Sequence, residues 1–130
     1  MIGSQLQKAI FAALITETAV ADGRIYDRVP ENPTFPYVTI GDAQVINDGN
    51  SCGDGWEVFE DVHLWSRPES GSKVEVKDLA PSVVSRLATT LAVTGFVVIL
   101  AELNSSRTFR DPDGLTEHSV LTFRFLLDPA

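Results

Sequence analysis

The chain has 130 residues, of which 18 are acidic and 10 are basic, so its formal net charge at pH 7 is −8. This length predicts a single domain over residues 1–130. The acidic balance argues against a surface that binds nucleic acid, because neutralising phosphates requires clustered Lys and Arg. The one cysteine in the sequence, Cys52, provides neither a disulfide framework nor a set of zinc ligands.

Targeting signals are not evident in this sequence. The N-terminus lacks the basic region followed by an unbroken apolar run that marks a signal peptide. The apolar run at residues 96–101 is far too short to cross a bilayer. We therefore expect a soluble protein of a reducing compartment that has no membrane partner.

A first helix is predicted over about residues 4–19, where apolar side chains recur at three- and four-residue spacing. Ser4 and Gln7 form a capping-box pattern at its start, and the sequence at residues 22–23 is typical of a stop. The same spacing predicts a second helix over residues 72–93. Pro81 either kinks this helix or, as a favoured first-turn residue, marks where it begins.

Five strands are expected from alternating side chains and turn residues. Three of them lie between the helices, at residues 24–27, 37–46 and 56–66, and the last two form a hairpin over residues 96–127. This order of elements predicts an α+β fold. We expect an antiparallel β-sheet with two helices packed on one face and a long projecting C-terminal β-hairpin.

The hairpin turn is predicted at residues 111–114, where Pro112 presets φ and Gly114 accepts the left-handed conformation. This is the pattern of a three-residue loop with a glycine bulge. It predicts the pairs Arg110 with Thr116, Thr108 with His118, Asn104 with Thr122, Leu103 with Phe123, Glu102 with Arg124 and Ala101 with Phe125. In that register Ile99 lies on the buried face, opposite Leu127.

The tip of this hairpin offers little to the core of a monomer, since it carries two arginines and one aromatic residue. An acidic protein could use such arginines to contact a neighbouring copy of itself. We therefore predict a subunit interface formed by Arg107, Phe109, Arg110 and Asp113. A closed ring needs an interface of this kind, in which one patch meets a different patch on the next copy.

His63 and His118 are the two histidines of the sequence, and each lies in a predicted strand near a carboxylate. If their strands are neighbours, the pair could bind a metal or act in acid–base chemistry, as in a small metal-dependent hydrolase. Half-buried strand residues are the more common explanation. We predict a protein that is not an enzyme and has no catalytic, cofactor-binding or metal site.

A small-molecule-binding module is a further alternative, and it would require a pocket between the sheet and the helices. That space is expected to be filled by Phe11, Leu14, Leu87, Leu103, Phe123 and Phe125. The glycine-rich segment at residues 47–55 has no lysine and no carboxylate at the twelfth position of a calcium loop. It is expected to be a surface loop with a possible role in contacting a partner.

Several segments together resemble a known family. Residues 24–27, 35–42, 63–67 and 107–118, followed by residues 123–125, are similar in sequence and order to the tail completion (tail terminator) proteins of long-tailed bacteriophages. Related proteins occur in gene transfer agents and prophages. The resemblance covers nearly the whole chain.

This resemblance implies a small α+β subunit that assembles as a hexameric ring in the virion. The ring would cap the head-proximal end of the tail tube, stop its polymerisation and join the tail to the head, after assembly in the bacterial cytoplasm. Its partners would be the tail tube protein and the head–tail connector protein, and a connector subunit is the nearest alternative. Six copies carry a charge of −48 (6 × −8), so we expect DNA to pass the lumen without specific binding.

Overall fold

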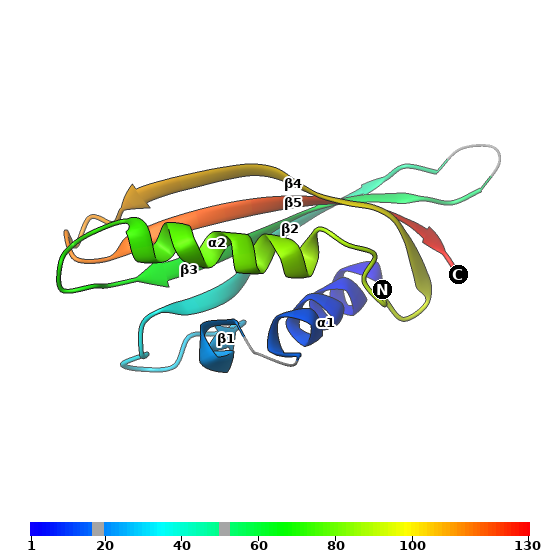
Figure 1. Cartoon of the computed structure of the whole chain (residues 1–130). Coiled ribbons are helices and arrows are strands. Elements are labelled where there is room, and N and C mark those ends of the chain that lie inside the picture. The colour runs from blue at the N-terminus through cyan, green and yellow to red at the C-terminus, as the bar shows by residue number, and fades with distance from the viewer. Residues whose placement is uncertain (17–19, 50–52) are drawn as a thin grey trace.

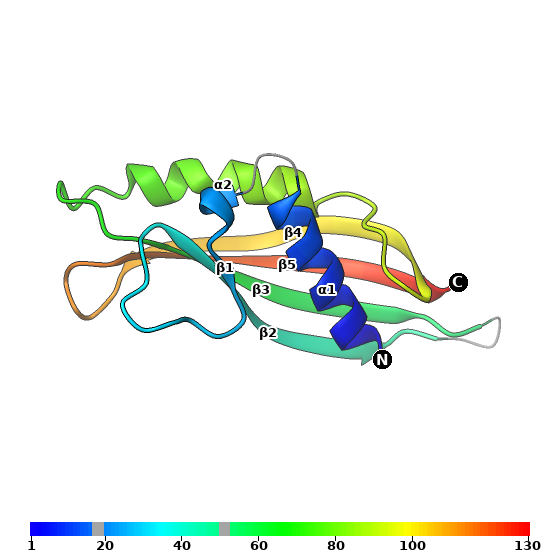
Figure 2. The ribbon, with the colours of Figure 1, turned by 90° about the horizontal axis from the view of Figure 1, so that it is seen from below.

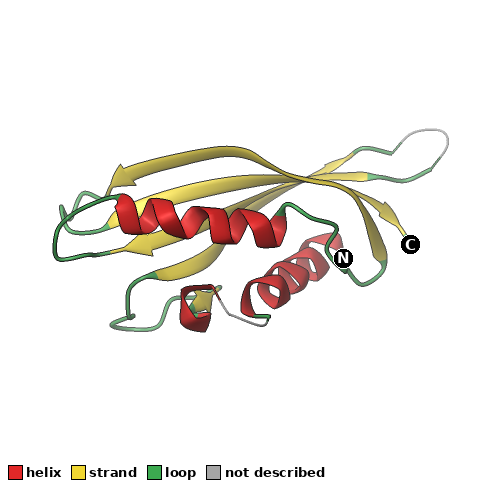
Figure 3. Ribbon diagram, in the orientation of Figure 1, coloured by secondary structure: helices red, strands yellow, loops and turns green. Residues whose placement is uncertain are grey.

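The computed structural model describes residues 1–16, 20–49 and 53–130, and it has two layers (Figure 1). The helices α1 (Ile2–Ile15) and α2 (Val74–Leu87) both cover one face of a five-stranded sheet (Figure 3). The other elements are the short 3-10 helix η1 (Val20–Gly23) and the strands β1 (Ile25–Tyr26), β2 (Tyr37–Asn47), β3 (Trp56–Ser66), β4 (Phe96–Arg110) and β5 (Glu117–Pro129). The predicted α+β fold class is confirmed, including the C-terminal hairpin of β4 and β5.

α1 begins two residues earlier than predicted, and the expected capping box is wrong. The Ser4 hydroxyl donates to the carbonyl of Met1 at 3.2 Å instead of capping the helix, because Ser4 already lies inside the first turn. The helix ends at Thr16, whose backbone is extended. The predicted continuation to residue 19 lies outside the described residues. The face toward the sheet buries Ile2, Leu6, Ile10 and Leu14.

α2 is shorter than predicted and contains Pro81 in its interior, so the alternative that Pro81 begins the helix is wrong. Proline has no backbone N–H, and at this position it removes the hydrogen bond that would otherwise reach the Lys77 carbonyl. The helix is held by its apolar face, which buries Val76, Val83 and Leu87 against β3 and β5. Packing therefore supports this helix where local hydrogen bonding is incomplete.

The strand order is β1-β2-β3-β5-β4, and every neighbouring pair is antiparallel except β1 and β2 (Figure 2). β1 runs parallel to β2 and pairs with Val38 and Thr39 alone. The expectation of a wholly antiparallel sheet is therefore wrong at this edge. The loop between β1 and β2 carries the chain back past its starting point, which makes the parallel pairing possible.

The predicted hairpin register is correct in the middle of the hairpin and wrong at its tip. Glu102 pairs with Arg124, and the pairs Ala101 with Phe125 and Leu103 with Phe123 are also as predicted. Toward the turn the observed pairs are Ser105 with Thr122, Thr108 with Ser119, Phe109 with His118 and Arg110 with Glu117, one residue away from the prediction. The connection therefore spans residues 111–116 and is longer than a three-residue loop.

Two irregularities in β4 absorb this difference. One lies between Leu103 and Ser105 and the other between Val98 and Leu100. The second irregularity turns Val98 inward, where it is 6% exposed, and leaves Ile99 outside at 56% exposed. The predicted burial of Ile99 is wrong because the bulge inserts one extra residue and changes which face each side chain takes.

The core lies between the helices and the inner face of β3 and β5. It includes Leu14, Leu87, Phe123 and Phe125, as predicted. Phe11 and Leu103 are exposed instead, so their predicted place in the core is wrong. In the described part of the chain, no helix is both long and apolar enough to cross a membrane.

Candidate subunit interface at the hairpin tip

Arg110, at the end of β4, is half exposed but forms its bonds within its own chain. Its Nε donates to Glu117 Oε1 at 2.6 Å, and its Nη2 donates to the Gly71 carbonyl at 2.9 Å. The Glu117 side chain is fully buried, and Lys73 Nζ lies 3.5 Å from its second oxygen. The hydrogen bond from Arg110 lowers the pKa of Glu117, although burial opposes the shift. Arg110 therefore ties the hairpin to the loop between β3 and α2.

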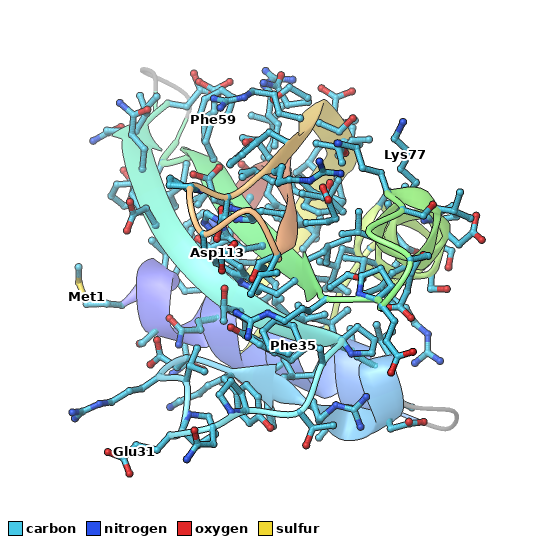
Figure 4. All side chains as sticks on the ribbon, turned by 90° about the vertical axis from the view of Figure 1, so that its left-hand side faces the viewer. Met1, Glu31, Phe35, Phe59, Lys77 and Asp113 are labelled. Atoms are coloured by element: carbon cyan, nitrogen blue, oxygen red, sulfur yellow. The ribbon has the colours of Figure 1, made fainter. Side chains whose placement is uncertain are left out.

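Asp113 also forms its bonds within the chain. Its Oδ1 accepts the backbone N–H groups of Leu115 and Thr116 at 2.8 and 2.9 Å, and its Oδ2 accepts bonds from the Thr116 hydroxyl and from Arg67. These bonds, chiefly the one from Leu115, lower the pKa of Asp113 to about 2. Arg67 also lies over the ring of Phe35, 4.6 Å from its centroid. Figure 4 looks onto this end of the molecule and shows Asp113 above Phe35.

Arg107 and Phe109 are the outward residues of the tip. The Phe109 ring is half-buried against His118, with 4.7 Å between ring centroids. The Arg107 side chain is exposed, and its guanidinium lies over the same Phe109 ring, 5.1 Å from the centroid. Among the described residues, no carboxylate forms an ion pair with Arg107. Of the four residues predicted to form an interface, these two are available to a partner, whereas Arg110 and Asp113 are engaged internally.

The structure brings the two histidines into contact. β3 and β5 are neighbours, and His63 Nδ1 lies 2.7 Å from His118 Nε2. His118 Nδ1 lies 3.3 Å from Asp111 Oδ1, and the Trp65 ring stacks on the His118 imidazole at 3.7 Å between centroids. Burial, and then the neighbouring His63, lower the pKa of His118. Nothing in the local sequence revealed this contact, because it depends on how two distant strands pair.

The two facing nitrogens form a hydrogen bond with each other, so one carries the proton and the other accepts it. In the described ranges, no group of three or more side chains is arranged to hold a metal ion. The geometry therefore gives a hydrogen-bonded imidazole pair next to the hairpin tip. It does not supply the ligand set that the metal-dependent hydrolase alternative requires.

A second cluster that the sequence analysis missed lies at the β2 edge. We call the carboxylates of Asp27, Asp42, Glu60 and Asp61 the acidic corner. Glu60 is 3% exposed and points to the helix side of β3, between Val58 and Val62. Burial raises its pKa to about 8, with further contributions from Asp61, Asp42 and Asp27. The sequence signal for this cluster was a glutamate at a position of β3 where the alternation of side chains predicts an apolar residue.

Glu60 has no hydrogen-bond or ion-pair partner in the part of the chain that the structure describes. A buried carboxyl group without a partner is costly when it is ionised. The carboxylates of the acidic corner thus have no ion-pair partner among the described residues, whereas the tip presents an exposed cation in Arg107. These two features lie near opposite edges of the sheet, since Asp42 belongs to β2 and Arg107 to β4.

The fold and these clusters define a small two-layer α+β protein with a polar hairpin tip braced against its own chain. A sequence model of the family described as tail completion protein gp17 matches residues 8–128. The chain therefore belongs to the tail completion protein gp17 family, as the resemblance predicted, and its role is a structural one in a phage-type tail. The tail completion protein gp17 of Bacillus phage SPP1 is 26% identical over 107 residues, which cover 78% of each chain.

Solved structures share this fold. One is a chain of the structure titled virion of native gene transfer agent (GTA) particle, with a TM-score of 0.87 and 19% identity over 98% of this chain and 97% of that chain. Another is the structure of bacteriophage SPP1 gp17 protein, with a TM-score of 0.62 and 23% identity over 94% of this chain and 88% of that chain. At these identities the likeness shows a common fold.

Proposed function

We propose that the chain is a tail terminator. Its copies form a ring, hexameric as the resemblance implies, that caps the head-proximal end of the tail tube and stops its polymerisation. The observation that carries this proposal is the family match across residues 8–128. The name of the SPP1 relative and the shared fold with a chain of a gene transfer agent virion support it. The partners in this proposal are the tail tube protein and the head–tail connector protein, met during assembly in the bacterial cytoplasm.

The hairpin tip supports a role as a rigid contact surface, and residues 1–130 act as one domain in this proposal. Arg107 and the outer side of Phe109 would touch the neighbouring subunit. Arg110 and Asp113 would contribute indirectly, because they fix the shape of the tip through Glu117 and Thr116. A braced tip loses little conformational freedom on association, which favours binding.

Inactivating the gene in its phage, prophage or gene transfer agent would test this role. A terminator predicts tails of uncontrolled length that are not joined to heads, seen by negative-stain electron microscopy. Antibody labelling of intact particles should mark the head-proximal end of the tail. Tails of normal length beside heads without tails would instead identify a head–tail connector subunit and overturn the terminator assignment.

We further propose that DNA passes the ring without specific binding. The net charge of −8 per chain repels phosphates. The uncovered face of the sheet carries Arg124, and this cation is neutralised by Glu57 at 2.6 Å and Glu102 at 3.1 Å. Electrophoretic mobility shifts with duplex DNA should show no complex at physiological salt, and a stable complex under those conditions would contradict the proposal.

A further inference from the structure

Both edges of the sheet are open over long stretches. β4 is the last strand on one side, so beyond the bridge of Phe96 to Val93 its outer edge has no strand neighbour among the described residues (Figure 1). On the other side, β1 pairs with two residues of β2 and leaves residues 41–47 uncovered, most of them exposed. An open strand edge presents unpaired N–H and C=O groups that can bind another strand. The molecule therefore has two different surfaces that are suited to strand pairing.

The two open edges also carry exposed apolar side chains. On β4 these are Val97, Ile99 and Leu103, and on the open part of β2 they are Val45 and Ile46. Apolar side chains along an unprotected edge are usually avoided, because they promote association. Their presence on both edges indicates that each edge is covered in the working assembly.

The strand directions allow one edge to meet the other. Neighbouring strands from β2 to β4 are all antiparallel, so β2 and β4 run in opposite directions within one copy. In a ring whose axis follows the strands, rotation preserves the direction of each strand. β4 of one copy and β2 of the next are then antiparallel neighbours, and the sheet continues from copy to copy.

The positions along the two edge strands also correspond. Following the pairing across the sheet, Leu100 lies in one row with Ile46, and Arg107 lies in one row with Thr39 and Tyr26. An unstaggered junction thus brings the apolar half of β4 to the open part of β2. From the row of Ile40 onward the place beside β2 is taken by the end of β1, so β4 must turn off the sheet beyond Ser105, which leaves Arg107 near Asp27 of the next copy.

Charge complementarity supports this arrangement. Among the described residues Arg107 is exposed and forms no ion pair, and neither do the carboxylates of the acidic corner (Asp27, Asp42, Glu60 and Asp61). Opposite charges placed across an interface set its register and disfavour wrong pairings. One exposed arginine and one unneutralised group of carboxylates on opposite edges are what a head-to-tail contact requires.

We propose that successive copies of this chain join edge to edge, with β4 of one copy pairing antiparallel with residues 41–47 of the next and Arg107 entering the acidic corner. This inference rests on the proposed ring, and it names the surfaces that join the ring. Because the two edges differ, the contact is head-to-tail, and it gives the proposed ring when the rotation from copy to copy closes.

Disulfide trapping in the full-length chain tests the junction. On a Cys52→Ser background, Ile46→Cys with Ile99→Cys places one thiol on each edge, and mild oxidation should give a covalent ladder beyond the dimer. The matched control combines Ile46→Cys with Val74→Cys, because Val74 is an exposed apolar residue of α2 and belongs to neither edge strand. We expect the control to stop at dimers, and equal ladders from both variants would overturn the proposal.

Charge reversal tests the contact of Arg107. Arg107→Glu should weaken self-association roughly tenfold by sedimentation analysis, and Arg107→Glu combined with Asp42→Arg should restore it. Lys77→Glu is the matched control, since it changes the net charge equally from an exposed position on α2 (Figure 4). A loss of association equal to that of Arg107→Glu in this control, or no recovery in the double variant, would overturn the proposed contact.

The two proposals can fail separately. If the wild-type chain stays monomeric at about 1 mM, the edges lack the affinity that this junction needs, and the edge proposal falls. The tail role is tested independently by tail length in particles without the protein. A ladder in solution with tails of normal length would retain the edge junction and reject the terminator.

Discussion

Arg110 and Glu117 face each other across the last pair of the β4–β5 ladder, and the arginine covers a carboxylate that has no contact with solvent. Their shortest distance is 2.6 Å, from Nε to Oε1. An arginine that looked free in the sequence is thus required by the chain's own core. Arg107, three residues earlier on the same strand, covers no buried carboxylate among the described residues.

Replacing Arg110 by alanine should destabilise the monomer. The change leaves buried Glu117 with Lys73 as its remaining cation at 3.5 Å, and breaking a buried ion pair is costly. Because Arg110 is itself partly exposed, we expect a loss of about 2 kcal/mol in the free energy of unfolding, measured by urea denaturation at pH 7. Arg107→Ala is the control, with an expected change within about 0.5 kcal/mol. Equal losses in the two variants would show that the Glu117 contact does not stabilise the fold.

The register at the tip could not be predicted from turn residues alone. The turn itself is present, because Gly114 donates to the Asp111 carbonyl at 3.0 Å and has φ of +72°. The side chain of Asp113 then binds the next two backbone N–H groups, and this keeps Leu115 and Thr116 in the loop. A side-chain acceptor thus extended the loop where backbone rules alone predicted a shorter one.

Asp113→Asn should lower the melting temperature at neutral pH. The bonds from Leu115, Thr116 and Arg67 favour the ionised carboxylate and hold its pKa near 2, below the ordinary 3.8. A lowered pKa contributes stability above about pH 3.8, and that stability is lost as the pH falls through 2. The difference in melting temperature between wild type and variant should therefore shrink below pH 3.8. A difference that stays constant down to pH 2 would count against the role of the charge.

The helices, β3 and the middle of the hairpin could be predicted from side-chain periodicity, because each is decided by neighbours in the sequence. The acidic corner could not, since it gathers Asp27, which follows β1, with residues of β2 and β3 around Glu60. The imidazole pair could not either, because His63 and His118 are 55 residues apart and meet through strand pairing. Clusters assembled by topology leave little local signal in a single sequence.

His118→Gln should reduce the acid sensitivity of the protein. Burial and the adjacent His63 lower the pKa of His118 below 6.5, with Asp111 opposing the shift and Arg107 adding to it. The folded state then binds fewer protons than the unfolded chain, so stability falls as the pH drops below about 6.5. Unfolding followed by fluorescence from pH 7.5 to 5 should show a flatter profile in the variant. His63→Gln removes one cause of the shift and should flatten the profile less.

Glu60→Gln should stabilise the isolated chain at neutral and higher pH. Burial raises the pKa of Glu60 from 4.5 to about 8, so the folded state holds a proton that the unfolded chain releases. Stability therefore falls as the pH rises from 4.5 toward 8, and at pH 7 this costs roughly 3 kcal/mol at 1.4 kcal/mol per unit. The gain from the variant should be small at pH 4.5 and should reach a plateau above pH 8, as measured by urea denaturation.

Glu57→Gln is the matched control for this prediction, because Glu57 lies on the opposite face of β3 and is paired with Arg124 at 2.6 Å. Losing that pair should lower stability slightly, with no gain that grows with pH. Assembly should also change the pH dependence that Glu60 causes. If Arg107 of a neighbouring copy enters the acidic corner, it favours the ionised carboxylate, and the pH dependence caused by Glu60 should weaken on assembly. A pH dependence that is unchanged in the assembly would place the arginine elsewhere.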